Sequence, residues 1–150
     1  MADRLFKLML ASPDGWVTRD DAEYLVLPGV EGYLGILANH APLMTAIGIG
    51  TMMYRDETGY EHILAIHDGF LEVSNNVATI LADSAEEGTC IDLDRAQQAL
   101  ERSKLRLQEA ADDPDIDSER ARAAYRRALN RIKVCEICDI KPKVQDQTSL

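Results

Sequence analysis

The histidines and cysteines are the first residues to test for chemistry, and their spacing does not build a site. His40, His62 and His67 show no spacing that puts two of them on one strand face beside a carboxylate. Cys135 and Cys138 have the spacing of a redox pair, but they fall near the end of an expected helix and lack two further zinc ligands. We therefore expect ordinary helix cysteines, no metal site, no catalytic residue and no turnover by the isolated chain.

A group of arginines late in the chain is the stronger candidate for binding. Guanidinium groups bind phosphates or carboxylates through paired hydrogen bonds, although such a group can also form a simple solvated helix face. Nucleic acid is a poor ligand for it, because the surrounding segment is neutral overall and Tyr125 is its single aromatic residue. The arginines are Arg120, Arg122, Arg126, Arg127 and Arg131.

Charge divides the chain in two. The net charge is −10; residues 1–91 carry 4 basic and 14 acidic side chains, whereas residues 92–150 carry 12 of each. Such a chain is repelled by nucleic acid and by anionic lipid. An odd, sparse set of three cysteines indicates a reducing compartment, and residues 1–4 do not begin a signal peptide. We expect a cytoplasmic protein.

The first part of the chain predicts short strands. A charge-free stretch between Glu31 and Arg55 is long enough for a membrane helix, but prolines, glycines and polar residues break it, which favours buried strands and turns. Regular short strands with such turns indicate a sandwich or flattened barrel. The expected strands are 5–11, 22–27, 51–54, 60–66, 70–73 and 77–81, with turns at 12–15, 28–29, 56–59, 68–69 and 74–76.

Beyond Gly88 the pattern becomes helical. Asp92 is a plausible N-cap, Pro114 interrupts the helix, and a second helix begins near Asp117 or Ser118. The small residues in its apolar stripe predict a close but weakly docked antiparallel hairpin. The fold class is α+β: an N-terminal antiparallel β-sandwich over 1–87, a C-terminal antiparallel α-helical hairpin over 88–140, and a disordered tail over 141–150.

The order of several motifs carries a family resemblance. The stretch 28–37, continuing through 40–43, resembles the signature of the epsilon subunit of bacterial F-type ATP synthases. Residues 69–73 and 77–86 resemble the end of that family's β-sandwich, and a hairpin follows where the family has one. Ala38-Asn39 and His67-Asp68 depart from the family pattern at two turns.

The resemblance implies a non-catalytic coupling subunit. Its β-domain would bind the gamma subunit and the membrane rotor c-ring, with Glu31 and His40 at the ring, so that ion-driven rotation reaches the catalytic head. The hairpin would be permissive when folded and would block ATP hydrolysis when extended, with Arg122, Arg126 and Arg127 meeting the alpha and beta subunits. The location implied is the cytoplasmic side of the inner (plasma) membrane, peripheral and without direct insertion.

A nucleotide motif is also implied by the resemblance. Some bacterial members bind ATP through an Ile-Asp-x-x-Arg-Ala motif and two arginines of the second helix, as a regulatory ligand rather than a required cofactor. The alternative is that Asp92 only caps a helix and the arginines are exposed; a free nucleotide-sensing or scaffold protein of this fold is a second hypothesis. The ATP-binding candidates are Glu86, Ile91, Asp92, Arg95, Ala96, Arg127 and Arg131.

Overall fold

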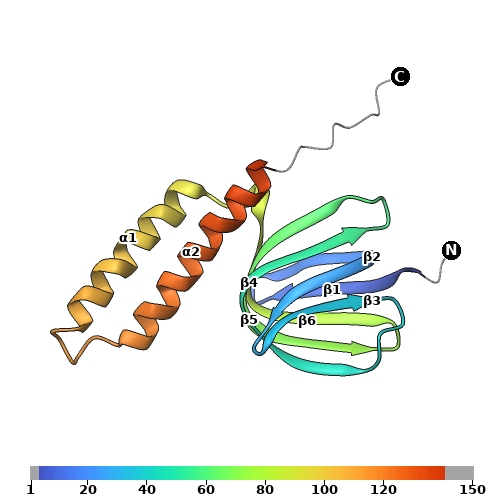
Figure 1. Cartoon of the computed structure of the whole chain (residues 1–150), viewed down its shortest axis with the longest axis horizontal. Helices are drawn as coiled ribbons and strands as arrows, with labels where there is room; N and C mark the ends of the chain where they lie inside the picture. The colour runs from blue at the N-terminus through green and yellow to red at the C-terminus, as the bar shows by residue number, and fades with distance from the viewer. Residues whose placement is uncertain (1–3, 141–150) are drawn as a thin grey trace, which may run out of the picture.

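A computed structural model describes residues 4–140, and it consists of a β-barrel followed by two helices (Figure 1). This confirms the predicted α+β class. The predicted tail, 141–150, lies outside the described residues. The elements are β1 (Phe6–Ser12), β2 (Gly15–Gly29), β3 (Gly32–Leu37), β4 (Leu43–Asp56), β5 (Glu61–Ser74), β6 (Val77–Glu87), the 3-10 helix η2 (Gly88–Cys90), α1 (Leu93–Ala110) and α2 (Ser118–Ile140).

The strands form one sheet that closes on itself. Its order is β1-β6-β5-β4-β2-β3, and β1 also pairs with β2, which joins the two sides. The β1–β6 pair is parallel and the other pairs are antiparallel. Alternate residues of each strand point inward, as strand geometry requires, and fill the core with side chains such as Leu8, Leu25, Met52 and Ile80. The result is the flattened barrel that the strand pattern allowed.

Two predicted turns are wrong. Asp68 and Gly69 do not end a strand: β5 runs through them, and Asp68 is skipped in its pairing with both β4 and β6. Left-handed backbone at both residues, with φ of 52° and 141°, makes a kink where a turn was expected. The β2–β3 turn is also displaced from Pro28-Gly29, because Gly29 pairs with Gly32 and leaves Val30 and Glu31 as the turn.

Strand β5 is buried on both faces. Leu64 and Ile66 point into the barrel core, whereas Ile63 and Ala65 belong to a second apolar cluster that includes Val134 of α2. Strand alternation places His67 on the same face as Ile63 and Ala65, and His67 is fully buried. Helix α2 therefore packs on the outside of the barrel, over β5 and β4.

Carboxylate caps fix where both helices begin. Asp92 accepts a 3.1 Å hydrogen bond from the main-chain nitrogen of Arg95, and Asp117 accepts an equal one from Arg120.

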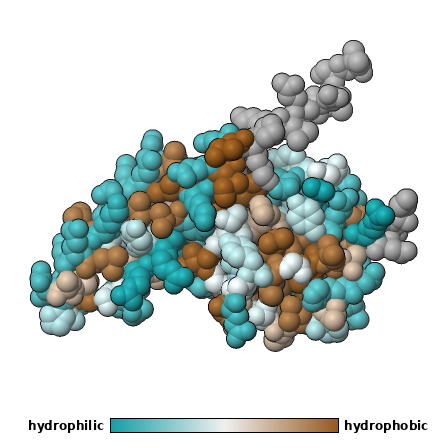
Figure 2. All heavy atoms as spheres, in the orientation of Figure 1, coloured by the Kyte–Doolittle hydropathy of each residue, from teal (hydrophilic) through white to brown (hydrophobic). Residues whose placement is uncertain are grey.

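The helices meet along small residues, among them Ala96, Ser103, Ala121 and Ala128, all buried. In Figure 1, α2 lies between α1 and the barrel. Figure 2 shows the visible face of the hairpin as mostly hydrophilic, while apolar side chains gather on the barrel.

Candidate functional site

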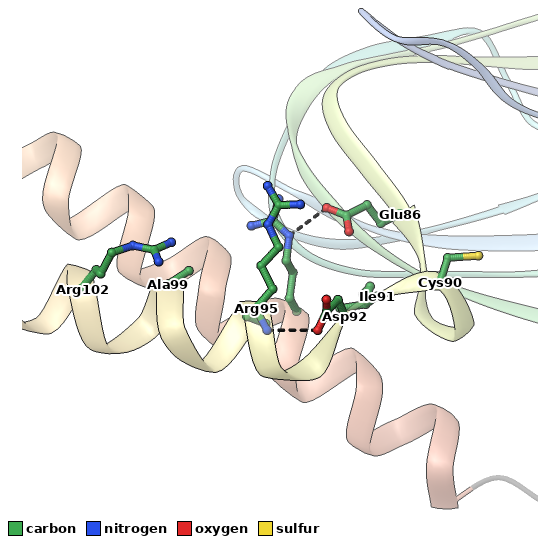
Figure 3. Close-up of a pocket in the computed structure, with 9 residues that line it drawn as sticks. Glu86, Cys90, Ile91, Asp92, Arg95, Ala99 and Arg102 are labelled. Atoms are coloured by element: carbon green, nitrogen blue, oxygen red, sulfur yellow. Dashed lines mark hydrogen bonds and ion pairs between the residues drawn. The ribbon is translucent and has the colours of Figure 1, made fainter.

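A cavity of about 450 Å³ lies where the barrel, the 3-10 helix η2 and the two helices meet (Figure 3). This volume falls within the range of small-molecule sites in proteins, which is about 300–1,000 Å³. The residues come from the end of β6, the connection to α1, the first turns of α1, and α2. The lining residues are Glu86, Cys90, Ile91, Asp92, Arg95, Ala96, Ala99, Arg102 and Arg131.

The structure brings most of the proposed nucleotide residues together at this cavity. Glu86, Ile91, Asp92, Arg95, Ala96 and Arg131 all line it, although they come from three separate elements. Arg127 does not line it. Convergence of these residues is a property of the fold, because the spacing of residues in sequence does not by itself bring β6 beside α2.

The charges around the cavity favour an anion. Arg131 Nε donates a 2.8 Å hydrogen bond to Glu86 Oε1, which links α2 to β6. Asp92 is engaged by the helix N-terminus that it caps. Within residues 4–140, neither Arg95 nor Arg102 forms an ion pair, so two guanidinium groups remain available to a ligand.

Sequence reasoning missed three lining residues: Cys90, Ala99 and Arg102. Arg102 carried a detectable signal, because it follows Arg95 by seven residues and two helical turns place both on one face. Figure 3 shows Arg102 on α1 beyond Arg95, along the same side of the helix. Cys90 is exposed at the end of η2, and no feature of the sequence pointed to it.

The three arginines predicted to contact the catalytic head do not share one surface. Arg122 and Arg126 are exposed, and Arg122 pairs with Glu119 of the same helix at 2.8 Å. Arg127 is half-buried and lies close enough to His67 to lower the pKa of that buried side chain. With the hairpin docked, the outer face of α2 presents the first two and the barrel partly covers the third.

The two residues predicted at the rotor ring lie at opposite ends of β3. Glu31 is exposed in the turn before the strand, and His40 follows the strand in the loop that leads to β4. Six strand residues between them span about 20 Å. The loop holding His40 is fixed by Asn39, whose main-chain nitrogen donates a 2.7 Å hydrogen bond to Asn76 Oδ1. Glu31 and His40 are therefore separate features of the surface.

A histidine with two carboxylates lies at the end of β6, next to η2. His62 Nε2 is 2.9 Å from Asp56 Oδ2, and His62 Nδ1 is 2.9 Å from Glu87 Oε1. Both carboxylates accept a hydrogen bond, so both ring nitrogens of His62 donate and the ring is positively charged. Burial works against this charge, but the hydrogen bonds with Asp56 and Glu87 outweigh it and raise the pKa of His62. The ring also stacks on Tyr54 with centroids 4.3 Å apart.

Residues 4–140 hold no cluster of three or more side chains suited to a metal ion. No helix in that range is long and apolar enough to cross a membrane. Cys90, Cys135 and Cys138 are free thiols, and burial raises the pKa of Cys135 and Cys138.

Comparison with known families matches both parts of the chain. Residues 5–88 match the family described as "ATP synthase, Delta/Epsilon chain, beta-sandwich domain". Residues 90–136 match "ATP synthase, Delta/Epsilon chain, long alpha-helix domain". The junction between the two matches falls at η2, where the strands end.

Comparison with individual proteins agrees. The chain is 41% identical over 136 residues to an ATP synthase epsilon chain of Syntrophomonas wolfei, covering 91% of this chain and 98% of that one. It is 48% identical over 127 residues to one from Desulfitobacterium hafniense, covering 85% and 93%. Among solved structures, a chain of the Euglena gracilis mitochondrial ATP synthase (OSCP/F1/c-ring) matches with a TM-score of 0.72 at 21% identity, covering 90% of this chain and 81% of that one; this likeness concerns the fold.

Proposed function

The chain belongs to the epsilon-chain family of F-type ATP synthases, and we propose that it is a non-catalytic coupling subunit whose hairpin senses ATP and inhibits hydrolysis. The barrel would bind the gamma subunit and the rotor c-ring and pass ion-driven rotation to the catalytic head. The hairpin would be permissive when docked as described above and inhibitory when it extends toward the alpha and beta subunits.

The surface of the barrel supports attachment to protein partners. Met44, Phe70 and Leu81 are 72%, 63% and 59% exposed, and Phe70 pairs with Leu81 across β5 and β6. Large exposed apolar side chains that gather on one surface are typical of protein interfaces. Glu31, exposed at the β2–β3 turn, would instead meet basic loops of the ring through charge. These two features suit a subunit with more than one partner.

The hairpin has the connections expected of a movable element. Its apolar contact with the barrel is a small cluster around Ile63, Ala65 and Val134, separate from the barrel core. The barrel closes its own sheet through β1 without the helices. Undocking therefore removes a limited contact and leaves the barrel core intact.

The observation that carries ATP sensing is the convergence of Glu86, Asp92, Arg95 and Arg131 on one cavity of about 450 Å³. The cavity needs both the barrel end and the docked α2, so a ligand that fills it binds the docked hairpin more tightly than the extended one. A ligand shifts a conformational equilibrium only through such a difference in affinity. Arg95, Arg102 and Arg131 would hold the phosphates, and ATP would oppose extension.

Reconstitution tests the coupling and inhibitory role. The full chain is added to a catalytic head preparation that lacks its own epsilon subunit, and ATPase activity and co-elution with gamma are measured. We expect co-elution and reduced hydrolysis, with the reduction smaller at high ATP. Unchanged activity together with no co-elution would contradict the proposal. ATP binding is tested separately by NMR shifts at residues 91–96 during titration of the isolated chain to millimolar ATP; no shifts would remove the nucleotide claim.

A further inference from the structure

His67 is a buried, incompletely satisfied histidine beneath α2. It is 0% exposed, its Nε2 lies 3.3 Å from Asn130 Nδ2, and its Nδ1 is buried without a hydrogen-bond partner among residues 4–140. Asn130 Nδ2 also donates to the main-chain oxygen of Gly50 at 2.8 Å. Because an amide nitrogen only donates, His67 Nε2 accepts its second hydrogen and the ring is neutral.

The charged side chains near His67 are two arginines of α2 and one carboxylate of β6. From α2 come Arg127 and Arg131; the cross-strand partners are Ile49 on β4 and Ser84 on β6. The nearby carboxylate of β6, Glu86, is paired with Arg131. The docked helix therefore buries the ring beside an amide donor and two guanidinium groups, one of which is paired with Glu86; this arrangement accepts a neutral imidazole and opposes a charged one.

We propose that His67 makes hairpin docking sensitive to acid: α2 docks over the neutral ring, and protonation of the ring favours the undocked hairpin. The inference rests on the movable hairpin of the proposed function. It concerns an equilibrium within this one chain, so it can be tested without the catalytic head.

The direction of the pH effect follows from the difference in the pKa of His67 between the docked and the undocked hairpin. Burial, then Arg131 and Arg127, lower the pKa of His67 to about 3 in the docked state. Undocking removes both arginines and exposes the ring, whose pKa then returns to about 6.5. The undocked state thus binds the extra proton, and docking weakens as pH falls below about 6.5. Between pH 7.5 and pH 5.5 the ratio of undocked to docked chains rises about tenfold.

Hydrogen exchange of the full chain tests the proposal. Amide protection of residues 121–135 is measured at pH 7.5 and 5.5 and corrected for the intrinsic pH dependence of exchange, with β1 and β6 as internal references. We expect about tenfold more opening of α2 at pH 5.5. The His67→Gln variant should lose this pH dependence, and the matched control His40→Gln, at a residue in a surface loop, should keep it. Equal opening at both pH values in the unmodified chain would overturn the proposal.

Titration of the unmodified chain provides a second measurement that requires no variant. The ring nitrogen shifts of His67 are followed by NMR while α2 protection is measured on the same samples. We expect the ring to stay neutral wherever α2 stays protected. A His67 that titrates near pH 6.5 under a protected α2 would overturn the proposal. Failure to inhibit a catalytic head would contradict the proposed function and leave both of these results unchanged.

Discussion

The side-chain nitrogen of Asn130 donates a 2.8 Å hydrogen bond to the main-chain oxygen of Gly50, joining α2 to β4 across 80 residues of sequence. The bond is buried, and Gly50 is enclosed on its other side by Pro28 and Tyr33, whose atoms lie 2.8 Å from where a Cβ would stand. A side chain at position 50 would therefore clash with Pro28 and Tyr33. The hydrogen bond from Asn130 holds α2 on the barrel in addition to the apolar contact around Val134.

Asn130→Ala should weaken docking of the hairpin. The change leaves the oxygen of Gly50 without its donor, and an unsatisfied buried group costs about 1–3 kcal/mol. Hydrogen exchange of α2 at pH 7.5 measures the effect. Leu129→Ala is the matched control, since the neighbouring Leu129 is 45% exposed and should change docking little. Equal protection of α2 in the two variants would show that Asn130 does not hold the helix.

Arg131→Ala should reduce affinity for ATP. A charged hydrogen bond contributes about 1.5–3 kcal/mol, so we expect Kd to rise about 10–100-fold. Calorimetric titration of the full chain measures this, and Arg122→Ala, exposed on the outer face of α2, is the control. A tenfold loss of ATP affinity in Arg122→Ala, or no loss in Arg131→Ala, would assign ATP binding to another surface.

Gly88→Ala should weaken the docking of α2 against η2. The added Cβ would overlap the sulfur of Cys138 and lie 2.9 Å from a methyl carbon of Val134. Overpacking of this kind costs about 1–3 kcal/mol. Adding Cys138→Ala to Gly88→Ala should restore part of the docking, measured by exchange of α2. The same loss with and without Cys138→Ala would place the clash elsewhere.

The His62 bridge should make the barrel more stable in mild acid than in base. Its raised pKa means that the stabilisation is fully present below the unfolded value of about 6.5, and is lost as pH rises through the folded value. The stabilisation also needs an ionised Asp56, whose pKa is kept low because hydrogen bonds from Thr58 and His62 outweigh the effect of burial. Urea unfolding followed by fluorescence of Trp16, the one tryptophan in the chain, should show about 1 kcal/mol less stability at pH 8.5 than at pH 6.

His62→Gln should reduce that difference, because a neutral amide carries no titrating charge between the two carboxylates. His40→Gln should retain it. A pH difference in barrel stability that survives His62→Gln would assign it to other groups.

The sequence reasoning succeeded where local chemistry decides structure. Asp92 predicted the start of the first helix, and the small residues along the second helix predicted the antiparallel hairpin, because capping and periodicity act over a few residues. It failed at Asp68-Gly69, where the same residue types serve a kink within β5 instead of a turn. Pairing of β5 with strands on both sides decided between them, and a single sequence does not show pairing.

Most residues of the candidate site were predictable from the sequence, but its geometry was not. A motif resemblance gathered Ile91, Asp92 and Arg131, and the fold places them around one cavity. Arg127 was included because it is four residues from Arg131, yet it lies nearer His67 than the cavity lining. The spacing of His67 from the other histidines and from carboxylates predicted no site there. Its proposed role depends on burial beneath α2, where Asn130, 63 residues later in the chain, contacts it.

Burial of β5 on its outer face has a consequence for chains that have not yet been assembled. Ile63, Ala65 and His67 would become solvent-exposed if α2 left the barrel, and exposed apolar strand surface promotes aggregation. In the free chain the docked hairpin would therefore protect this face of β5 from aggregation.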